Sequence, residues 1–217
     1  IVGRPQDVPA AYFDGIVHRL NAQFPHYRLR RSDNLFVAAQ TVDDLVAVSA
    51  QLELTARSLI KIAKDVRLLA SGPQAGCQEL VLPAVQPGSS IMPGKVNPVI
   101  PEFLIQVCYR VIGNHQMAAM AVEHGELDLN VWESPVIFGI LDSMNLLGDA
   151  LTTFQEKCLA GLQVSVATNS EKADSLIALL VSLSKVHGYS AISQLCKSAD
   201  GDFDQIRALI EERGLKA

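Results

Sequence analysis

The chain has little positive charge and no cluster of it. Its 18 Lys and Arg residues stand against 23 Asp and Glu, a net charge of −5, and no basic run is longer than the pair Arg30 and Arg31. Proteins that bind nucleic acid present clustered basic side chains, because the phosphate backbone dominates their affinity. The sequence therefore predicts no nucleic-acid partner.

Cysteine is also scarce, and its spacing excludes the common cysteine sites. The four cysteines are far apart, without a CxxC pair, and none has histidines at zinc-ligand spacing; they are Cys77, Cys108, Cys158 and Cys196. Widely spaced free thiols are typical of a reducing compartment. We therefore expect a cytoplasmic protein without disulfides.

The histidines show no metal-binding spacing either. They are His18, His26, His115, His124 and His187. His115 and His124 are nine residues apart, which places them on opposite sides of one helix. We therefore predict no metal and no other cofactor, and the single Trp132 is interpreted as a packing residue.

Long hydrophobic runs are missing as well. A membrane span needs about 18 uninterrupted apolar residues, and the richest candidates are broken by Glu102, Arg110 and Asp142. The first residues lack the charged start and apolar core of a signal peptide. We therefore expect a soluble protein without a membrane partner, and because the chain opens with Ile1 we expect it to be a fragment.

Helical patterns dominate what the sequence does contain. Hydrophobic residues make up 49% of 217 residues, enough for a substantial core. Residues 11–24 show a helical period that Pro25 ends. A longer helix is predicted over 41–69, with Thr41 as N-cap, Asp43 and Asp44 in its first turn, and a length of about 45 Å.

The long helix is apolar on more sides than one neighbour can bury. Its hydrophobic residues cover more than a single stripe, so several helices, including helices of other subunits, are expected to cover it. Similarly long apolar patterns run over 98–125 and 134–160. Together these segments predict an all-α fold with an elongated helical bundle.

The pattern changes after Gly161. Shorter helices are predicted over 170–183, 191–198 and 202–213. We therefore place a domain boundary near Ala167, with an incomplete central bundle over 1–167 and a small C-terminal helical domain over 168–217.

One polar loop interrupts the apolar helices, with the sequence "GSSIMPGKVNP" over 88–98. A phosphate-binding loop is excluded because five residues instead of four separate its glycines, because Val96 follows the lysine, and because no strand precedes it. A plain connection between two helices remains open, since Gly and Pro serve any turn. It does not explain why two hydroxyls, an ammonium group and an amide occur together, groups suited to binding and deprotonating an acidic substrate.

Residues 88–102, "GSSIMPGKVNPVIPE", resemble the signature of the fumarase/aspartase superfamily, and the ending "NPVIPE" is closer to aspartate ammonia-lyases. Four more segments follow the order and spacing of that family: "LASGPQAGCQELVLP" at 69–83, "VIGN" at 111–114, "GELDLNVWE" at 125–133 and "EKCLAG" at 156–161. The resemblance covers essentially the whole chain. It implies an all-α bundle that assembles into homotetramers with composite active sites. It also implies a dicarboxylate substrate, L-aspartate or fumarate.

The resemblance implies roles for the residues of the loop. Ser89 is expected to be the general base that removes a proton next to a carboxylate, with Ser90 as its neighbour on a mobile loop. Lys95 and Asn97 are assigned to binding the substrate carboxylates, and Met92 to substrate binding with them. A serine alkoxide needs nearby positive charge, aimed N–H groups and exclusion of water.

Glu102 is the third residue expected to be catalytic, and it has an alternative. In the family the matching carboxylate orients a histidine from another segment. A glutamate in the first turn of a helix is also favoured by the helix dipole alone, and both interpretations stay open.

The chain departs from the family pattern at several positions that bear on its catalytic activity. No histidine here follows a threonine, so the threonine-histidine motif is absent, and Arg4, Pro5 and Gln74 stand where the family has other residues. We expect the chain to be about the C-terminal half of a subunit. Two hypotheses remain: the catalytic-loop half of an aspartase-like lyase, with fumarate hydratase or another succinate-type lyase as alternatives, or a catalytically silent helical scaffold.

Overall fold

The computed structural model describes residues 8–72 and 75–216, so Arg4, Pro5 and Gln74 lie outside the described residues. Over this part of the chain the prediction of an all-α fold is confirmed, because the only strands, β1 (Leu80–Val81) and β2 (Gln163–Val164), have two residues each. The described residues form two compact units, the first within 8–67 and 85–160 and the second within 68–72, 75–84 and 161–216.

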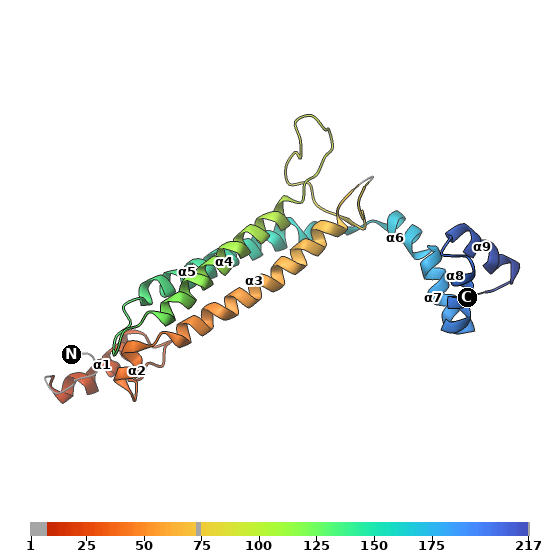
Figure 1. The fold of residues 1–217 in the computed structure, drawn as a ribbon. Coiled ribbons are helices and arrows are strands. Elements are labelled where there is room, and N and C mark those ends of the chain that lie inside the picture. The colour runs from red at the N-terminus through yellow and green to blue at the C-terminus, as the bar shows by residue number, and fades with distance from the viewer. Residues whose placement is uncertain (1–7, 73–74, 217) are drawn as a thin grey trace. The chain divides into compact units, whose positions relative to one another are not determined.

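The first unit is built around three long helices that lie side by side (Figure 1). Its helices are α1 (Ala10–Gln23), α2 (Leu35–Gln40), α3 (Asp43–Leu69), α4 (Val99–Glu123) and α5 (Glu133–Lys157). The four helices predicted here from hydrophobic periodicity are thus confirmed, with ends that differ by at most three residues. α2 was not predicted.

The start of α3 corrects one detail of the prediction. The helix begins at Asp43, and its hydrogen-bond pattern starts with Val46 N donating to Val42 O. Thr41 is not its N-cap, because Thr41 ends α2: both its backbone N and its Oγ1 donate to Val37 O. Asn34 caps the start of α2.

α4 and α5 form the tightest helix pair of this unit. Fully or nearly fully buried side chains fill the space between them, among them Leu104, Val111, Ala118, Val136 and Leu147. α3 contributes small residues to the packing, since Ala56 and Ala63 are completely buried. Small side chains let a helix approach its neighbours closely.

Each long helix also exposes large apolar side chains. Leu54 on α3, Met120 on α4 and Phe138 on α5 are 59%, 60% and 70% exposed. As predicted, the helices are apolar on more sides than the helices of one chain cover. Exposed apolar surface of this extent is typical of protein interfaces.

The second unit contains the remaining elements. They are β1 and β2, which pair antiparallel, and helices α6 (Val166–Ala173), α7 (Leu176–His187), α8 (Tyr189–Ser198) and α9 (Phe203–Glu212). The predictions over 191–198 and 202–213 are confirmed by α8 and α9. The prediction of a single helix over 170–183 is wrong. α6 ends at Ala173, and a new helix, α7, begins after Ser175, whose Oγ accepts a hydrogen bond from Ala178 N.

The helical core of this unit comes from α7, α8 and α9. Its buried side chains include Leu183, Leu195 and Ile206. The two contact-defined units divide the chain differently from the predicted domains: Ala167 lies within α6, and the second unit also takes up 68–84.

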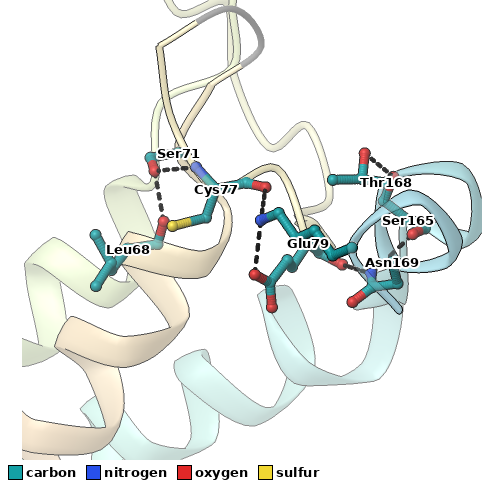
Figure 2. Close-up of polar contacts among 8 residues, drawn as sticks. Leu68, Ser71, Cys77, Glu79, Ser165, Thr168 and Asn169 are labelled. Atoms are coloured by element: carbon teal, nitrogen blue, oxygen red, sulfur yellow. Dashed lines mark hydrogen bonds and ion pairs between the residues drawn. The ribbon is translucent and has the colours of Figure 1, made fainter. Parts of the chain in front are cut away.

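Polar contacts join residues 77–79 to α6 and its N-cap residue Ser165 (Figure 2). Glu79 is their centre, because its backbone O accepts from Ser165 N at 2.9 Å and from Asn169 Nδ2 at 3.0 Å. Lys172 Nζ donates to the Glu79 carboxylate at 2.7 Å and to Cys77 O at 2.8 Å. These bonds continue the β1–β2 pairing and fix residues 77–79 within this unit.

Candidate active-site loop

The polar loop over 88–98 leads into α4 and is closed by two hydrogen bonds. Gly88 N donates to Lys95 O at 2.9 Å, and Asn97 Nδ2 donates to Gly88 O at 2.8 Å. In Figure 1 it is the rounded loop next to the first turn of α4. The two ends of the signature are therefore held together.

Two glycines make this closure possible. A Cβ atom at Gly88 would lie 2.4 Å from Lys95 O, so any other residue would push the loop open. Gly94 has φ +77°, a conformation that side chains rarely adopt. The glycines are thus required by the shape of the loop.

Ser89 follows Gly88 at the start of the loop. Its Oγ accepts hydrogen bonds from the backbone N–H groups of Ile91 and Met92, both at 3.2 Å. The residue is half-buried, while Ser90 is exposed. Bonds from N–H groups two and three residues along the chain are a common local turn contact of serine, and two such donors also favour negative charge on the oxygen that accepts them.

The other loop residues differ in exposure. Lys95 and Met92 are exposed, whereas Asn97 is half-buried. The amide of Asn97 has a structural contact that sequence reasoning missed, its bond to Gly88 O across nine residues. No local sequence pattern predicts this bond, because it forms only when the loop is closed.

Glu102 lies in the first turn of α4 and pairs with an arginine. Its Oε1 is 3.0 Å from Nε of Arg67, near the C-terminal end of α3. The resemblance implies a histidine partner from another segment, with a first-turn glutamate favoured by the helix dipole as the alternative; within the described residues, the ion-pair partner of Glu102 is Arg67. Arg67 places a positive charge beside this carboxylate.

A second polar cluster lies between α3 and α4, around His115. Its Nδ1 is 3.2 Å from Ser49 Oγ and its Nε2 is 3.2 Å from Glu53 Oε2. Arg57 donates to the other carboxylate oxygen, with Nε at 3.0 Å and a second nitrogen at 2.6 Å. The order Ser–His–Glu resembles a catalytic triad, but Ser49 is 4% exposed and no substrate can reach it.

A third cluster joins α4 to α5. Asn114 Nδ2 donates to Asp142 Oδ2 at 2.9 Å, and Arg110 Nε donates to the same oxygen at 3.2 Å. These hydrogen bonds, that of Asn114 first, lower the pKa of Asp142 below its ordinary value of 3.8. Asn114 also contacts Ser143 Oγ at 3.0 Å, so the cluster sets the register of the two helices.

Neither a metal-binding group nor a membrane-spanning helix is found in residues 8–72 and 75–216. No group of three His, Cys, Asp or Glu side chains is placed to hold a metal ion. No helix in these ranges has the length and the apolar character needed to cross a membrane.

Comparison with known proteins identifies the family. A family model described as "Lyase" matches residues 1–113. The chain is 36% identical over 214 residues to an aspartate ammonia-lyase from a Bacillus species, covering 99% of this chain and 46% of that protein. It is 37% identical over 213 residues to a class II fumarate hydratase from Thermosynechococcus vestitus, covering 98% and 45%.

Solved structures agree with the sequence matches. A fumarate lyase:delta crystallin structure from Brucella melitensis superimposes with a TM-score of 0.88 at 40% identity, over 100% of this chain and 47% of that chain. A class II fumarase from Schistosoma mansoni gives 0.82 at 30% identity, over 97% and 47%. The chain therefore belongs to this lyase family, the fumarase/aspartase superfamily, and it spans about half the length of the relatives it matches.

Proposed function

We propose that this chain supplies the base-bearing loop of an aspartate ammonia-lyase that converts L-aspartate to fumarate and ammonia. The observation that carries the proposal is the position of Ser89 Oγ, which accepts two backbone N–H groups inside a closed, glycine-dependent loop. Aimed N–H groups are one of the conditions for a serine alkoxide, and the positive charge and the exclusion of water are proposed to come from the rest of a composite site. The similarity to aspartate ammonia-lyases supports the choice of substrate.

In the proposed reaction the Ser89 alkoxide removes a proton from the carbon next to the substrate carboxylate. The electron pair of that C–H bond spreads into the carboxylate as an enolate-like dianion. When it returns to form the carbon–carbon double bond, the bond to nitrogen breaks and ammonia leaves with that bond's electron pair. Lys95 and Met92, both exposed on the same loop, are proposed to bind the substrate, Lys95 through the charge of one carboxylate.

Asn97 and Glu102 have proposed roles at the edge of the loop. Asn97 has one amide hydrogen bonded to Gly88 O, which leaves its second amide hydrogen for a substrate carboxylate. Glu102 is half-exposed beside Arg67 and is proposed to orient a histidine from the rest of a composite site. In this proposal the protein works as a homo-oligomer, a tetramer in the complete enzyme.

Fumarate hydratase is a second candidate, because class II fumarate hydratases are as similar to this chain as aspartate ammonia-lyases are. The loop alone does not distinguish the two leaving groups, since Ser89 acts on the carbon–hydrogen bond in both reactions. A helical scaffold without catalysis is the third candidate, in keeping with the large apolar side chains that the long helices expose.

The experiment follows fumarate by its absorbance in the near ultraviolet, with L-aspartate or L-malate as substrate. The 217-residue chain is measured alone and after refolding with the N-terminal half of a Bacillus aspartate ammonia-lyase. Activity with L-aspartate on mixing supports the proposal, and activity with L-malate favours the hydratase. Silence in every mixture, with co-folding verified by sedimentation, supports the scaffold.

Two serine variants make the test specific to the loop. Ser89→Ala is expected to lower turnover by about 10²-fold or more, the range for loss of a general base. Ser90→Ala is the matched control, an exposed neighbour whose loss leaves most turnover. Equal losses in the two variants would contradict the assignment of the base to Ser89.

A further inference from the structure

One ion pair joins the end of α3 to the start of α4, next to the polar loop over 88–98. Arg67 lies in the last turn of α3 and Glu102 in the first turn of α4, and these two helix ends lie at the same end of the first unit (Figure 1). Each charge is favoured by the dipole of its own helix, a cation at a C-terminus and an anion at an N-terminus. The contact spans 35 residues of sequence.

The backbone on both sides of this pair is fixed by packing. Val66, beside Arg67, is buried in the first unit, and Pro101, beside Glu102, is among its fully buried residues. The two charged side chains are 55% and 39% exposed. The pair is thus held by two packed helix turns and remains accessible to a further group.

The geometry of the contact occupies only one side of the carboxylate. Arg67 Nε donates to Glu102 Oε1 at 3.0 Å, whereas a guanidinium that pairs in the two-bond fashion engages both oxygens of a carboxylate. The described part of the chain offers no hydrogen bond to the other oxygen, Oε2. One oxygen of Glu102 is therefore held, and the other is left to accept a bond.

Glu102 is also joined to the loop through the backbone. Its N–H donates to Pro98 O at 3.1 Å, and the preceding residue, Asn97, closes the loop onto Gly88. The carboxylate that Arg67 holds consequently has a defined position relative to the loop that carries Ser89.

We propose that Arg67 is a positioning residue for the lyase reaction, which holds Oε1 of Glu102 so that Oε2 is available to the histidine of a composite site. The inference rests on the proposed function, in which Glu102 orients that histidine. Arginine suits this task, because its guanidinium is permanently charged and its Nε–H has a fixed direction. Exposed ion pairs contribute little to stability, so the loss of Arg67 should affect turnover and leave the fold intact.

The ion pair itself is tested in the 217-residue chain, without any measurement of activity. The Nε–H of Arg67 is expected to exchange with water more slowly in the unchanged chain than in the Glu102→Ala variant, because a bonded proton is exposed only when the pair opens. Nitrogen-15 NMR of the arginine side chains measures the exchange. Equal rates in the two forms would overturn the proposal, whatever the activity of the chain.

The positioning role is tested by turnover of L-aspartate after refolding with the N-terminal half of a Bacillus aspartate ammonia-lyase. Arg67→Met is expected to lower kcat by about tenfold and to leave KM nearly unchanged, because Arg67 does not contact the substrate in this proposal. Arg110→Met is the matched control: Arg110 also bonds one carboxylate oxygen through Nε, that of Asp142, and the pair has a similar exposure of 66% and 42%. Its kcat should stay as in the unchanged chain.

A double-mutant cycle decides whether Arg67 acts through Glu102. Residues that work through one contact are not additive, so adding Arg67→Met to Glu102→Ala should lower kcat no further. A further loss in the double variant would overturn the proposal, and so would equal losses in Arg67→Met and Arg110→Met. Full turnover of Arg67→Met beside a silent Ser89→Ala would refute the role of Arg67 alone, whereas silence of the unchanged chain would refute the proposed function and this role with it.

Discussion

His115 Nε2 lies 3.2 Å from Glu53 Oε2, which ties the middle of α4 to α3. The two side chains are only 13% and 15% exposed, so water cannot replace either partner freely. A carboxylate oxygen accepts, so Nε2 carries the proton and, in the neutral ring, Nδ1 accepts from the hydroxyl of Ser49. The contact therefore fixes the tautomer of the histidine and the register of the two helices.

Replacing His115 with Ala is expected to lower the free energy of unfolding by about 1–3 kcal/mol, because Ser49 and Glu53 would each lose a partner. His18→Ala is the control, since His18 is exposed on α1. Urea unfolding followed by circular dichroism measures both. A His115→Ala variant as stable as His18→Ala would show that the contact contributes nothing.

Replacing Asn97 with Ala is expected to open the loop over 88–98. The variant loses the bond from Asn97 Nδ2 to Gly88 O, and a loss of about 1 kcal/mol corresponds to an increase of about fivefold in local opening. Hydrogen exchange at the amide of Gly88 measures the change. Lys95→Ala is the comparison, because it keeps the backbone bond that Lys95 O accepts; equal exchange in both variants would contradict the role of Asn97.

Asp142 is expected to make stability depend on pH in the acid range. Hydrogen bonds from Asn114 and Arg110 favour the ionised carboxylate, so its folded pKa lies below 3.8. A lowered folded pKa means that this stabilisation is present above the unfolded pKa of about 3.9 and is lost as the pH falls through the folded value. An NMR titration of the Asp142 carboxyl carbon measures the midpoint.

Two variants identify the cause of the shift at Asp142. Arg110→Met and Asn114→Ala should each raise the midpoint toward 3.8, with the larger effect for Asn114, which is the larger cause. Arg110 is exposed, so its replacement tests the effect without disturbing the helix packing. A midpoint that stays in place in both variants would exclude these bonds as the cause.

The cysteines are expected to react in two groups. Cys77 and Cys196 are half-buried, whereas Cys108 and Cys158 are buried, and burial raises the pKa of Cys108 to about 11 and raises that of Cys158. Because the thiolate is the reactive form, iodoacetamide at pH 8 should label the first two in the folded chain and all four in urea. Mass spectrometry of tryptic peptides distinguishes the sites, and early labelling of Cys108 would contradict the packing between α4 and α5.

The hydrophobic period predicted the long helices of the first unit, since a helix that packs along its length repeats apolar residues every three to four positions. Short elements were less predictable. α2 has six residues, too few for a periodic signal, and its presence moved the start of α3. The break between α6 and α7 was not predicted, because Asp174 and Ser175 also occur inside helices. Only the hydrogen bond that Ser175 Oγ accepts from Ala178 N marks the start of a new helix.

The candidate site likewise has features that the sequence predicted and contacts that it did not. The residues of "GSSIMPGKVNP" and their likeness to one family could be read from the sequence, because glycines, hydroxyls and charges at fixed spacing are local information. Their assigned roles remain predictions. The bond from Asn97 to Gly88, the pairing of Glu102 with Arg67 and the contact of His115 with Glu53 join residues 9, 35 and 62 positions apart.

The sequence by itself determined the helical class, the place of the polar loop and the excess of apolar helix surface, because these depend on residue type and local period. Only the tertiary structure decided which polar groups pair. A buried donor takes the acceptor that the packed helices bring within reach, and that choice depends on the whole fold. The exposed bond from Trp132 Nε1 to His124 O also depends on tertiary structure, since it forms through the turn that connects α4 to α5.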